Sequence, residues 1–190
     1  MMRLILCPVC KLCLVGCFFA VATGIIYSRF SKPTARLLFS DRALISPCED
    51  GEALMFRVVN RRLNVLMEME ASVLLFMDVG KSEQVSRKFY NLDLETSSIT
   101  FFSLSWTIVH PFQGTSPIKN IGIEELVKRK AEILILLKGF DETFGQNIRL
   151  RFSYTADEIV SNTKFIRNFE VTKNGQIELN IEAVHSFEKL

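Results

Sequence analysis

Four cysteines near the start of the sequence have the spacing of an iron–sulfur ligand loop. Cys7, Cys10, Cys13 and Cys17 follow the pattern C-x2-C-x2-C-x3-C, in which thiolates hold a cluster. Such a loop needs flexible, glycine-rich backbone, whereas these cysteines lie in a Leu/Val/Phe run that predicts a helix, where cysteine serves as a small hydrophobe. Packing is therefore preferred over cluster binding. Cys48 is then alone in the rest of the chain, which predicts no disulfide framework.

The other reactive side chains form no recognisable catalytic site. His110 and His185 are far apart, neither lies in a nucleophile motif, and no glycine loop could cradle a phosphate. His110 lies in an apolar run, which favours a hydrogen-bonded structural histidine over a proton shuttle. A net charge of +2 is too near neutral for a nucleic-acid-binding surface. The sequence predicts a protein that is no enzyme, binds no nucleic acid and needs no metal or cofactor.

The apolar excess of the chain is concentrated at its start. From Leu4 to Tyr27 the only strongly polar side chain is Lys11, and a spanning helix needs about 20 apolar residues. Four cations follow this run, namely Arg29, Lys32, Arg36 and Arg42. Because cytoplasmic flanks carry the excess of Lys and Arg, residues 1–32 are predicted to be a transmembrane helix of the plasma (cell inner) membrane, with the C-terminal domain in the cytoplasm.

A lipoprotein signal peptide is the competing interpretation. Leu14-Val15-Gly16-Cys17 has the form of a lipoprotein cleavage box. Lys11 interrupts the apolar region, and cleavage before Cys17 would leave a mature start that is still hydrophobic enough for a bilayer. The membrane helix is therefore the preferred interpretation.

From residue 33 onward the pattern is one of short strands separated by turns. Asp50-Gly51 and Asn174-Gly175 are hairpin turns by residue type, and Val65–Met77 is a long strand with Glu68 and Glu70 on one face and Met67 and Met69 on the other. The only helix predicted is short, at Gly122–Lys130, and Val79–Lys88 is predicted to be a loop. Seven or more strands favour a mainly β fold, an immunoglobulin-like β-sandwich over residues 33–190. Further strands are expected at Ala43–Ile45, Leu54–Val59, Ser98–His110, Glu132–Lys138, Asn147–Tyr154, Lys164–Val171 and Gln176–Glu182.

Several segments of the chain stand in an order that is specific when they are taken together. They begin with TGIIYSRFSKP at Thr23–Pro33, the segment Ala35–Ile45, and Gly51–Val73 with its Met-x-Arg strand, Asn-Arg turn and acid-bearing strand. They continue through Thr107–His110, Ser116-Pro117, GFDET at Gly139–Thr143 and RFSYTADEI at Arg151–Ile159. In this order they resemble the inward-rectifier potassium channels, particularly their prokaryotic branch, with Thr23–Pro33 similar to the end of the inner pore helix and Ala35–Ile45 to the first cytoplasmic strand.

The resemblance implies a homotetramer in which each subunit gives one helix to a potassium pore and one β-sandwich to a cytoplasmic ring. The family also requires an outer helix, a pore helix and a TVGYG-like filter, and this sequence contains none of them. We therefore expect a potassium-channel subunit or fragment from a truncated or altered gene start. The alternative is a membrane-tethered β-sandwich interaction module without transport activity.

Two groups of site residues follow from the resemblance at the membrane end. Phe19, Thr23 and Tyr27 recur at i, i+4 and i+8 and would line the pore, with Tyr27 at the gate; the alternative for Tyr27 is an interfacial belt residue. Arg29, Lys32 and Arg36 follow the helix, where the family binds anionic membrane lipid. The positive-inside rule alone would also explain these cations.

The other implied site residues lie in the β domain. Glu68 resembles an acid of the cytoplasmic conduit, where Lys138 replaces a second acid; a solvated strand face would also explain Glu68. Glu142 and Arg151 match an acid and a base of the constriction loop, which would pair, or they are ordinary surface charges. Phe19 stands where strong rectifiers carry an acid in the helix, so the chain is expected to rectify weakly.

Overall fold

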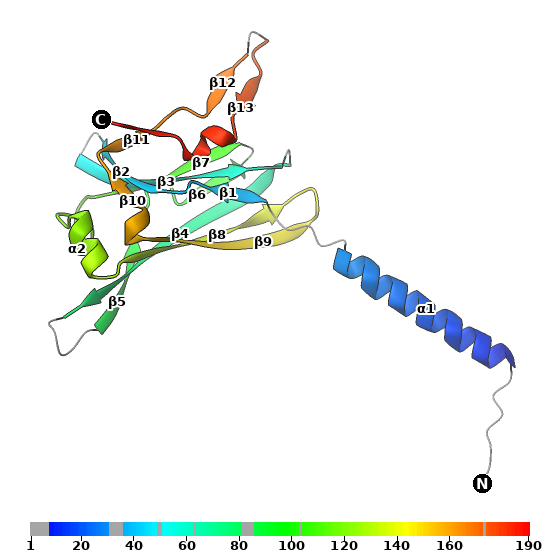
Figure 1. The fold of residues 1–190 in the computed structure, drawn as a ribbon. Coiled ribbons are helices and arrows are strands. Elements are labelled where there is room, and N and C mark those ends of the chain that lie inside the picture. Colours follow the sequence, from blue (N-terminus) through cyan, green and yellow to red (C-terminus); the bar gives the residue numbers. More distant parts are fainter. Residues whose placement is uncertain are drawn as a thin grey trace. The chain divides into compact units, whose positions relative to one another are not determined.

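The computed structural model describes residues 8–30, 36–48, 51–62, 64–80, 86–102, 104–172 and 174–190, with side chains of the first range described for residues 12–27. The chain divides into two units, residues 1–34 and residues 35–190 (Figure 1). The first unit contains one helix and the second contains all the strands. The mainly β prediction is therefore confirmed.

The first unit is helix α1, Pro8–Phe30. Pro8 occupies its first position, where the missing N–H costs no intrahelical hydrogen bond. None of the helices formed by the described residues is both long and apolar enough to cross a membrane. The helix is therefore confirmed at the predicted place, and the membrane span is not.

The first sheet is built around strand β3, Gly51–Asn60. Strand β7, Ser105–Pro111, pairs antiparallel along one edge of β3. The other edge of β3 pairs with two strands, one after the other along its length. These are β2, Ala43–Cys48, and β1, Leu37–Phe39. The fifth strand, β10 at Ile159–Ser161, lies parallel to β2. The predicted hairpin between β2 and β3 is confirmed, and its turn residues 49–50 lie outside the described residues.

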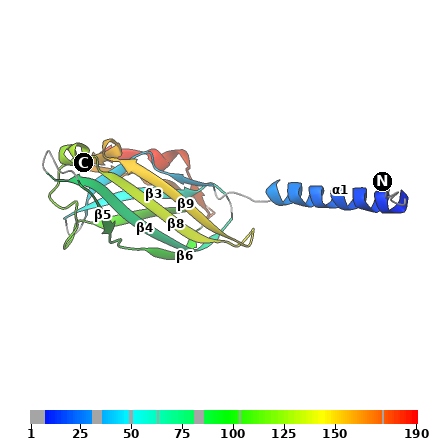
Figure 2. The same cartoon turned by 90° about the horizontal axis from the view of Figure 1, so that it is seen from below.

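The second sheet is built around strand β4, Leu66–Val79. One edge of β4 pairs with β8, Glu132–Asp141, which pairs in turn with β9, Gln146–Thr155. The other edge pairs with β6, Ser98–Phe102, and β5, Ser86–Leu92. Figure 2 shows β4, β8 and β9 running side by side.

The remaining elements are short. Helix α2, Ile123–Lys128, is confirmed close to its predicted place, and 3-10 turns cover Ala156–Glu158 and Glu182–His185. Strand β11, Thr163–Phe165, pairs with β14, Phe187–Lys189. Strands β12, Phe169–Val171, and β13, Ile177–Leu179, form the predicted hairpin, in which Gly175 has a φ of +75°. This hairpin projects from the body in Figure 1.

The core lies between the two large sheets and follows the period-two pattern of their strands. Along β4 the inward residues are Ala71, Val73, Leu75 and Met77, all buried, and β8 contributes Ile133, Ile135 and Leu137. Burial of each of these Val, Leu, Ile and Met side chains stabilises the fold by about 1.5–3 kcal/mol, and burial of Ala71 by less. The core is thus assembled from the two long central strands.

Tyr154 ties β9 to the start of the first sheet. Its hydroxyl is fully buried and donates to the carbonyl oxygen of Ser40 at 2.6 Å. Its ring packs against Phe56 and Phe152, and Phe152 stacks on Phe39 at 4.5 Å between ring centroids. Burial raises the pKa of Tyr154 well above its ordinary value.

Two strand predictions and one loop prediction are wrong in detail. Ser98–His110 is two strands, because β6 belongs to the second sheet and β7 to the first. Lys164–Val171 is also two strands, β11 and β12, in two small sheets. The predicted loop at Val79–Lys88 contains the start of β5, a strand that the sequence pattern did not indicate.

Candidate functional site

A β-bulge in β4 positions the acid predicted to face a conduit. Met67 is opposite Phe140 of β8, and Glu70 is opposite Lys138, so Glu68 and Met69 together face Gly139. Glu68 has a φ of +50°, a left-handed conformation that costs a non-glycine residue about 1 kcal/mol. Glu68 and Glu70 are exposed and Met69 is buried, as predicted, but Met67 is only half-buried and Leu66 points inward instead.

Gly139 makes this bulge possible. A Cβ at this position would collide with Sδ of Met69 and lie 3.2 Å from the carbonyl oxygen of Met67. A larger residue at position 139 would therefore force Met69 to move. The sequence contained both residues but no pattern that paired them.

The outer face beside the bulge carries a row of charges across three strands. Glu70 on β4 is opposite Lys138 on β8, and Lys138 is opposite Arg149 on β9. Glu68, Lys138 and Arg151 are also exposed. Directly opposed side chains in a sheet lie about 5 Å apart at Cβ, so Glu70 and Lys138 are close enough to offset each other. Sequence reasoning found Glu68, Lys138 and Arg151, and missed Glu70 and Arg149 as members of this charged row.

A buried acid joins two turns at one end of the sandwich. Asp141, at the end of β8, accepts hydrogen bonds from Nδ2 of Asn64 at 2.9 Å and from the backbone N–H of Thr143 at 3.1 Å. Asn60 in turn donates to the carbonyl oxygen of Asn64 at 2.6 Å. The turn after β3 and the turn between β8 and β9 are therefore joined through hydrogen bonds to Asp141, a residue that the sequence did not single out. The role implied for the neighbouring Glu142 stays a prediction.

Glu142 and Arg151 are not brought together within the chain. Glu142 is exposed in the turn between β8 and β9. Arg151 lies five residues along β9 from Gln146, roughly 17 Å away at about 3.4 Å per residue. It lines a small hollow of about 310 Å³ with Phe76, Phe89 and Glu132.

The predicted helix residues are exposed and share one face of α1. Phe19 is 66% exposed and Tyr27 is 74% exposed. The hydroxyl of Thr23 donates to the carbonyl oxygen of Phe19 at 2.7 Å. This bond within the helix satisfies the hydroxyl donor of Thr23 locally.

The predicted lipid-contact residues lie at the edge of the described chain. The side chain of Arg29 and all of Lys32 lie outside the described residues. Arg36 is exposed, and its carbonyl oxygen accepts from the N–H of Arg61 at 3.0 Å. The chain therefore enters the β unit beside the turn that follows β3.

His110 is the buried structural histidine that the sequence favoured. Its Nδ1 faces the carbonyl oxygen of Asp93, and its Nε2 lies 2.9 Å from Oγ of Ser116. Burial lowers the pKa of His110, although the Asp93 carbonyl opposes this effect. Within the part of the chain that the structure describes, no cluster of His, Cys, Asp and Glu could hold a metal ion.

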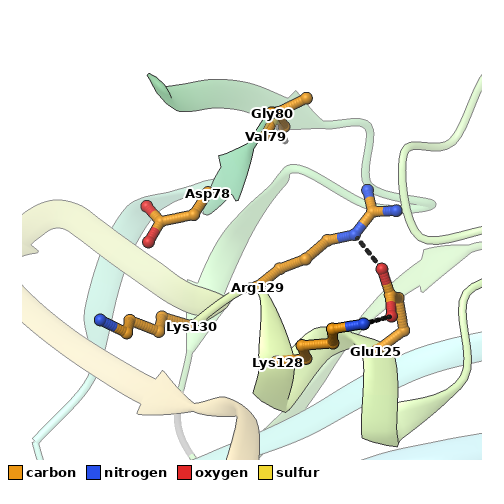
Figure 3. A pocket seen from close by; sticks show the side chains of 7 residues that line it. All are labelled: Asp78, Val79, Gly80, Glu125, Lys128, Arg129 and Lys130. Carbon is orange, nitrogen blue, oxygen red and sulfur yellow. Dashed lines mark hydrogen bonds and ion pairs between the residues drawn. The ribbon is translucent and has the colours of Figure 1, made fainter. Parts of the chain in front are cut away.

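A pocket of about 490 Å³ lies between the end of β4 and helix α2 (Figure 3). Two of its three cations, Lys128 and Arg129, have an acidic neighbour. Nε of Arg129 contacts Oε1 of Glu125 at 2.8 Å, and Nζ of Lys128 lies 4.0 Å from the other oxygen of that carboxylate. The hydrogen bond from Arg129 lowers the pKa of Glu125. Lys130 also lines the pocket, so three cations face two acids, Asp78 and Glu125, and one positive charge remains.

The fold and these surfaces define a mainly β domain with a charged outer face and no catalytic cluster among its described residues. Residues 37–190 match the family model described as "Inward rectifier potassium channel C-terminal domain". The chain belongs to the inward rectifier potassium channel family. Members of this family are ion channels and not enzymes.

The relatives differ in how much they share with this chain. It is 37% identical over 167 residues to the inward rectifier potassium channel Kirbac3.1 of Paramagnetospirillum magnetotacticum, covering 87% of this chain and 57% of that protein. It is 27% identical to the ATP-sensitive inward rectifier potassium channel 14 of Mus musculus, covering 80% of this chain and 37% of that protein. The sporulation control protein Spo0M of Bacillus subtilis covers 68% of this chain at 13% identity with a TM-score of 0.33, which is too distant to indicate a shared fold.

Proposed function

We propose that the chain serves as a subunit, or as part of a subunit, of an inward-rectifier-type potassium channel. The observation that carries this proposal is the match of residues 37–190 to the family's C-terminal domain. The chain spans 57% of the length of its prokaryotic relative, so transport itself is part of the proposal. In this proposal residues 1–32 are the pore-lining membrane helix and residues 33–190 the cytoplasmic gating domain of a homotetramer.

The helix face of Phe19, Thr23 and Tyr27 would line the potassium pathway. The three residues recur every four positions and so share one helix face, which each subunit of a homotetramer could turn toward the common axis. Phe19 and Tyr27 are exposed in the single chain, which leaves them free for such contacts. A ring of Tyr27 side chains would close the pathway by dewetting.

The charged row on the second sheet would set the electrostatics of the cytoplasmic conduit. Two acids, Glu68 and Glu70, stand against three cations, Lys138, Arg149 and Arg151, which leaves one positive charge per chain. Glu68 is then the main carboxylate to attract polyamines, and Lys138 counteracts it. Weak rectification follows from this balance.

The membrane end would use the remaining predicted residues. Arg29, Lys32 and Arg36 would meet anionic lipid headgroups, each cation gaining about 1 kcal/mol from the surface potential. Glu142 would stand at the tip of the constriction loop, which Asp141 holds against the turn after β3. Any pairing of Glu142 with Arg151 would have to join different subunits.

The proposal is tested by grafting Gly16–Leu190 behind the outer helix, pore helix and filter of a prokaryotic relative. We expect potassium currents with weak inward rectification. Lys138→Glu should strengthen spermine block about tenfold or more, because it changes the charge of a fourfold ring by eight units. Glu68→Gln should make spermine block weaker than in the unmodified graft. Glu158→Gln, on the 3-10 turn after β9, is the matched control and should leave the block unchanged.

Two outcomes would contradict the proposal. A folded graft that reaches the membrane and carries no potassium current would favour the tethered interaction module. Steep spermine block that neither substitution changes would show that Glu68 and Lys138 lie away from the ion pathway.

A further inference from the structure

A cavity of about 580 Å³ lies between the first sheet and the C-terminal hairpin, away from the charged row. Strands β3 and β7 supply Arg57 and Thr107, and the segments around β11 to β13 supply Phe165, Phe169, Ile177 and Leu179. Small-molecule sites in proteins commonly measure about 300–1,000 Å³ and combine an apolar lining with a few fixed polar groups. This cavity has both properties.

Its floor contains a buried cation that lacks an anionic partner. Arg57 is only 7% exposed. Nη1 donates to the carbonyl oxygen of Ile166 at 2.8 Å, Nε donates to Oγ1 of Thr107 at 3.4 Å, and the guanidinium lies 4.5 Å from the centre of the Phe165 ring. All three partners are neutral, and none of the ion pairs among the described residues involves Arg57. A buried charge is costly unless it is paired, so an anion at this position would stabilise it.

The rim of the cavity keeps this positive character. Lys164 and Glu188, both on the lining, are register partners on β11 and β14, so they largely offset each other. Arg167 lies 4.3 Å from the Phe169 ring and adds a second uncompensated cation. Anions are therefore attracted to the entrance as well as to the floor.

The opposite wall is apolar because the hairpin is amphipathic. Phe169 is paired with Leu179, and Val171 with Ile177, which places these four side chains on one face. Glu170 and Glu178 are paired on the other face. Phe169, Ile177 and Leu179 line the cavity, and Ile177 is still 53% exposed. A two-stranded hairpin is only marginally stable alone, so a ligand that covers this face would also stabilise the hairpin.

We propose that this cavity binds an amphipathic organic anion, a medium-chain carboxylate whose headgroup pairs with Arg57 and whose tail covers Phe169, Ile177 and Leu179. The single buried guanidinium suits one carboxylate, which two N–H groups can bind side by side. A polyphosphate would need several fixed donors at its charged end, where the cavity supplies one buried cation and exposed rim residues. The pocket beside α2 supplies no buried cation, since Lys128 and Lys130 are exposed and Arg129 already contacts Glu125.

The test is calorimetric titration of the full chain with octanoate. Heats of dilution into the same buffer, with any detergent present, are subtracted. We expect saturable binding of one octanoate per chain. Two probes of matched tail length, 1-octanol and octylammonium, should bind at least tenfold more weakly, because they lack the anionic head.

Two substitutions assign the site. Arg57→Gln should weaken octanoate binding at least tenfold and leave octanol binding unchanged. Because Arg57 is buried and this variant could fail to fold, Ile177→Ser provides a surface test, with an expected loss of about three- to tenfold. Val171→Ser is its matched control, since Val171 lies on the same hairpin face outside the cavity lining, and it should bind octanoate like the original chain.

Three results would overturn the proposal. Octanol that binds as tightly as octanoate would indicate partition of the tail alone. Equal effects of Ile177→Ser and Val171→Ser would place the ligand elsewhere. ATP or pyrophosphate binding more tightly than octanoate would assign the cavity to phosphate ligands.

Discussion

His110 illustrates how a buried polar residue of this domain depends on its protonation state. The Asp93 carbonyl oxygen can only accept, so Nδ1 carries the proton and Nε2 of the neutral ring is the acceptor for Ser116. A second proton would have to be placed in a site where only 3% of the residue surface is exposed. The neutral ring is therefore the form that fits the fold.

The pH dependence of stability follows from this residue. Because burial lowers the pKa of His110 in the folded chain, its contribution is fully present above the unfolded pKa of about 6.5 and is lost as pH falls toward the lower folded value. We expect the urea midpoint of the full chain to fall between pH 7.5 and pH 5. His110→Gln should cost about 1–3 kcal/mol at pH 7.5 and should show a smaller fall over the same interval.

His185→Gln serves as the control, since it leaves His110 and its partners in place. The urea midpoint of His185→Gln should fall between pH 7.5 and pH 5 as it does in the original chain, whereas the fall in His110→Gln should be smaller. Parallel pH profiles for His110→Gln and the original chain would contradict the assignment of this fall to His110.

At the level of elements, the bulge between β4 and β8 determines which side chains reach the charged face. Before the bulge the inward residue is even-numbered, Leu66. After the bulge the inward residues are odd-numbered, namely Met69, Ala71 and Val73. A regular β4 would keep Met67 in phase with Met69 and turn Leu66 outward. The bulge therefore buries Leu66 and turns Met67 partly outward, while Glu68 and Glu70 stay in solvent as they would on a regular strand.

Gly139→Ala should disturb this element. The added Cβ would collide with Sδ of Met69, so we expect a loss of about 1–3 kcal/mol in the free energy of unfolding, measured by urea denaturation. Gly24→Ala is the control, because Gly24 lies inside helix α1, a Cβ there meets nothing within 4 Å, and alanine favours a helix more than glycine does, so this variant should lose no stability.

A double-mutant cycle separates the collision from a general effect of removing glycine. Since Met69→Ala removes the colliding atom, Gly139→Ala should cost much less in that background. Equal costs in both backgrounds would exclude Met69 as the cause.

The strands with clear alternation or turn residues could be predicted from the sequence, and those without them could not. Asp50-Gly51 and Asn174-Gly175 located two hairpins, since these residue types suit tight turns. Strand β5 was missed because Ser86–Leu92 is largely exposed and polar, so its pairing with β4 leaves no hydrophobic pattern. Ser98–His110 was predicted as one strand because apolar residues continue across the point where the chain changes sheets.

The candidate site was predictable only in its separate residues. Glu68 and Lys138 were found through the family resemblance, but their relation depends on a register shift that no local pattern records. The same is true of Arg57, whose burial without a carboxylate arises from strands that lie far apart in sequence, since its Nη1 partner is Ile166. Contacts of this kind depend on tertiary packing and not on local propensity.

At the level of the whole molecule, the second sheet leaves large apolar side chains in solvent. Phe101 on β6 is 65% exposed and Phe89 on β5 is 64% exposed. Phe89 packs edge-on against Phe76, with ring centroids 5.0 Å apart, so it is held in place as a surface feature. Phe101 is opposite Met67 and Phe89 is opposite Phe76, so the two rings lie nine residues apart along β4 and form separate exposed positions. Phe101 has no ring partner among the described residues, and an exposed aromatic side chain of this kind is a typical interface anchor. We therefore expect Phe101 to lie at a contact between subunits.

We expect the full chain to form tetramers in analytical ultracentrifugation at high concentration in a mild detergent. Phe101→Ser should raise the dissociation constant roughly tenfold, because truncating an aromatic anchor costs about 1–2 kcal/mol. Val127→Ser, on the outer side of α2 and 42% exposed, is the matched control and should leave assembly unchanged. A chain that sediments as a monomer at hundreds of micromolar would contradict the homotetramer. Tetramers that Phe101→Ser does not weaken would place the subunit interface on a different face of the β unit.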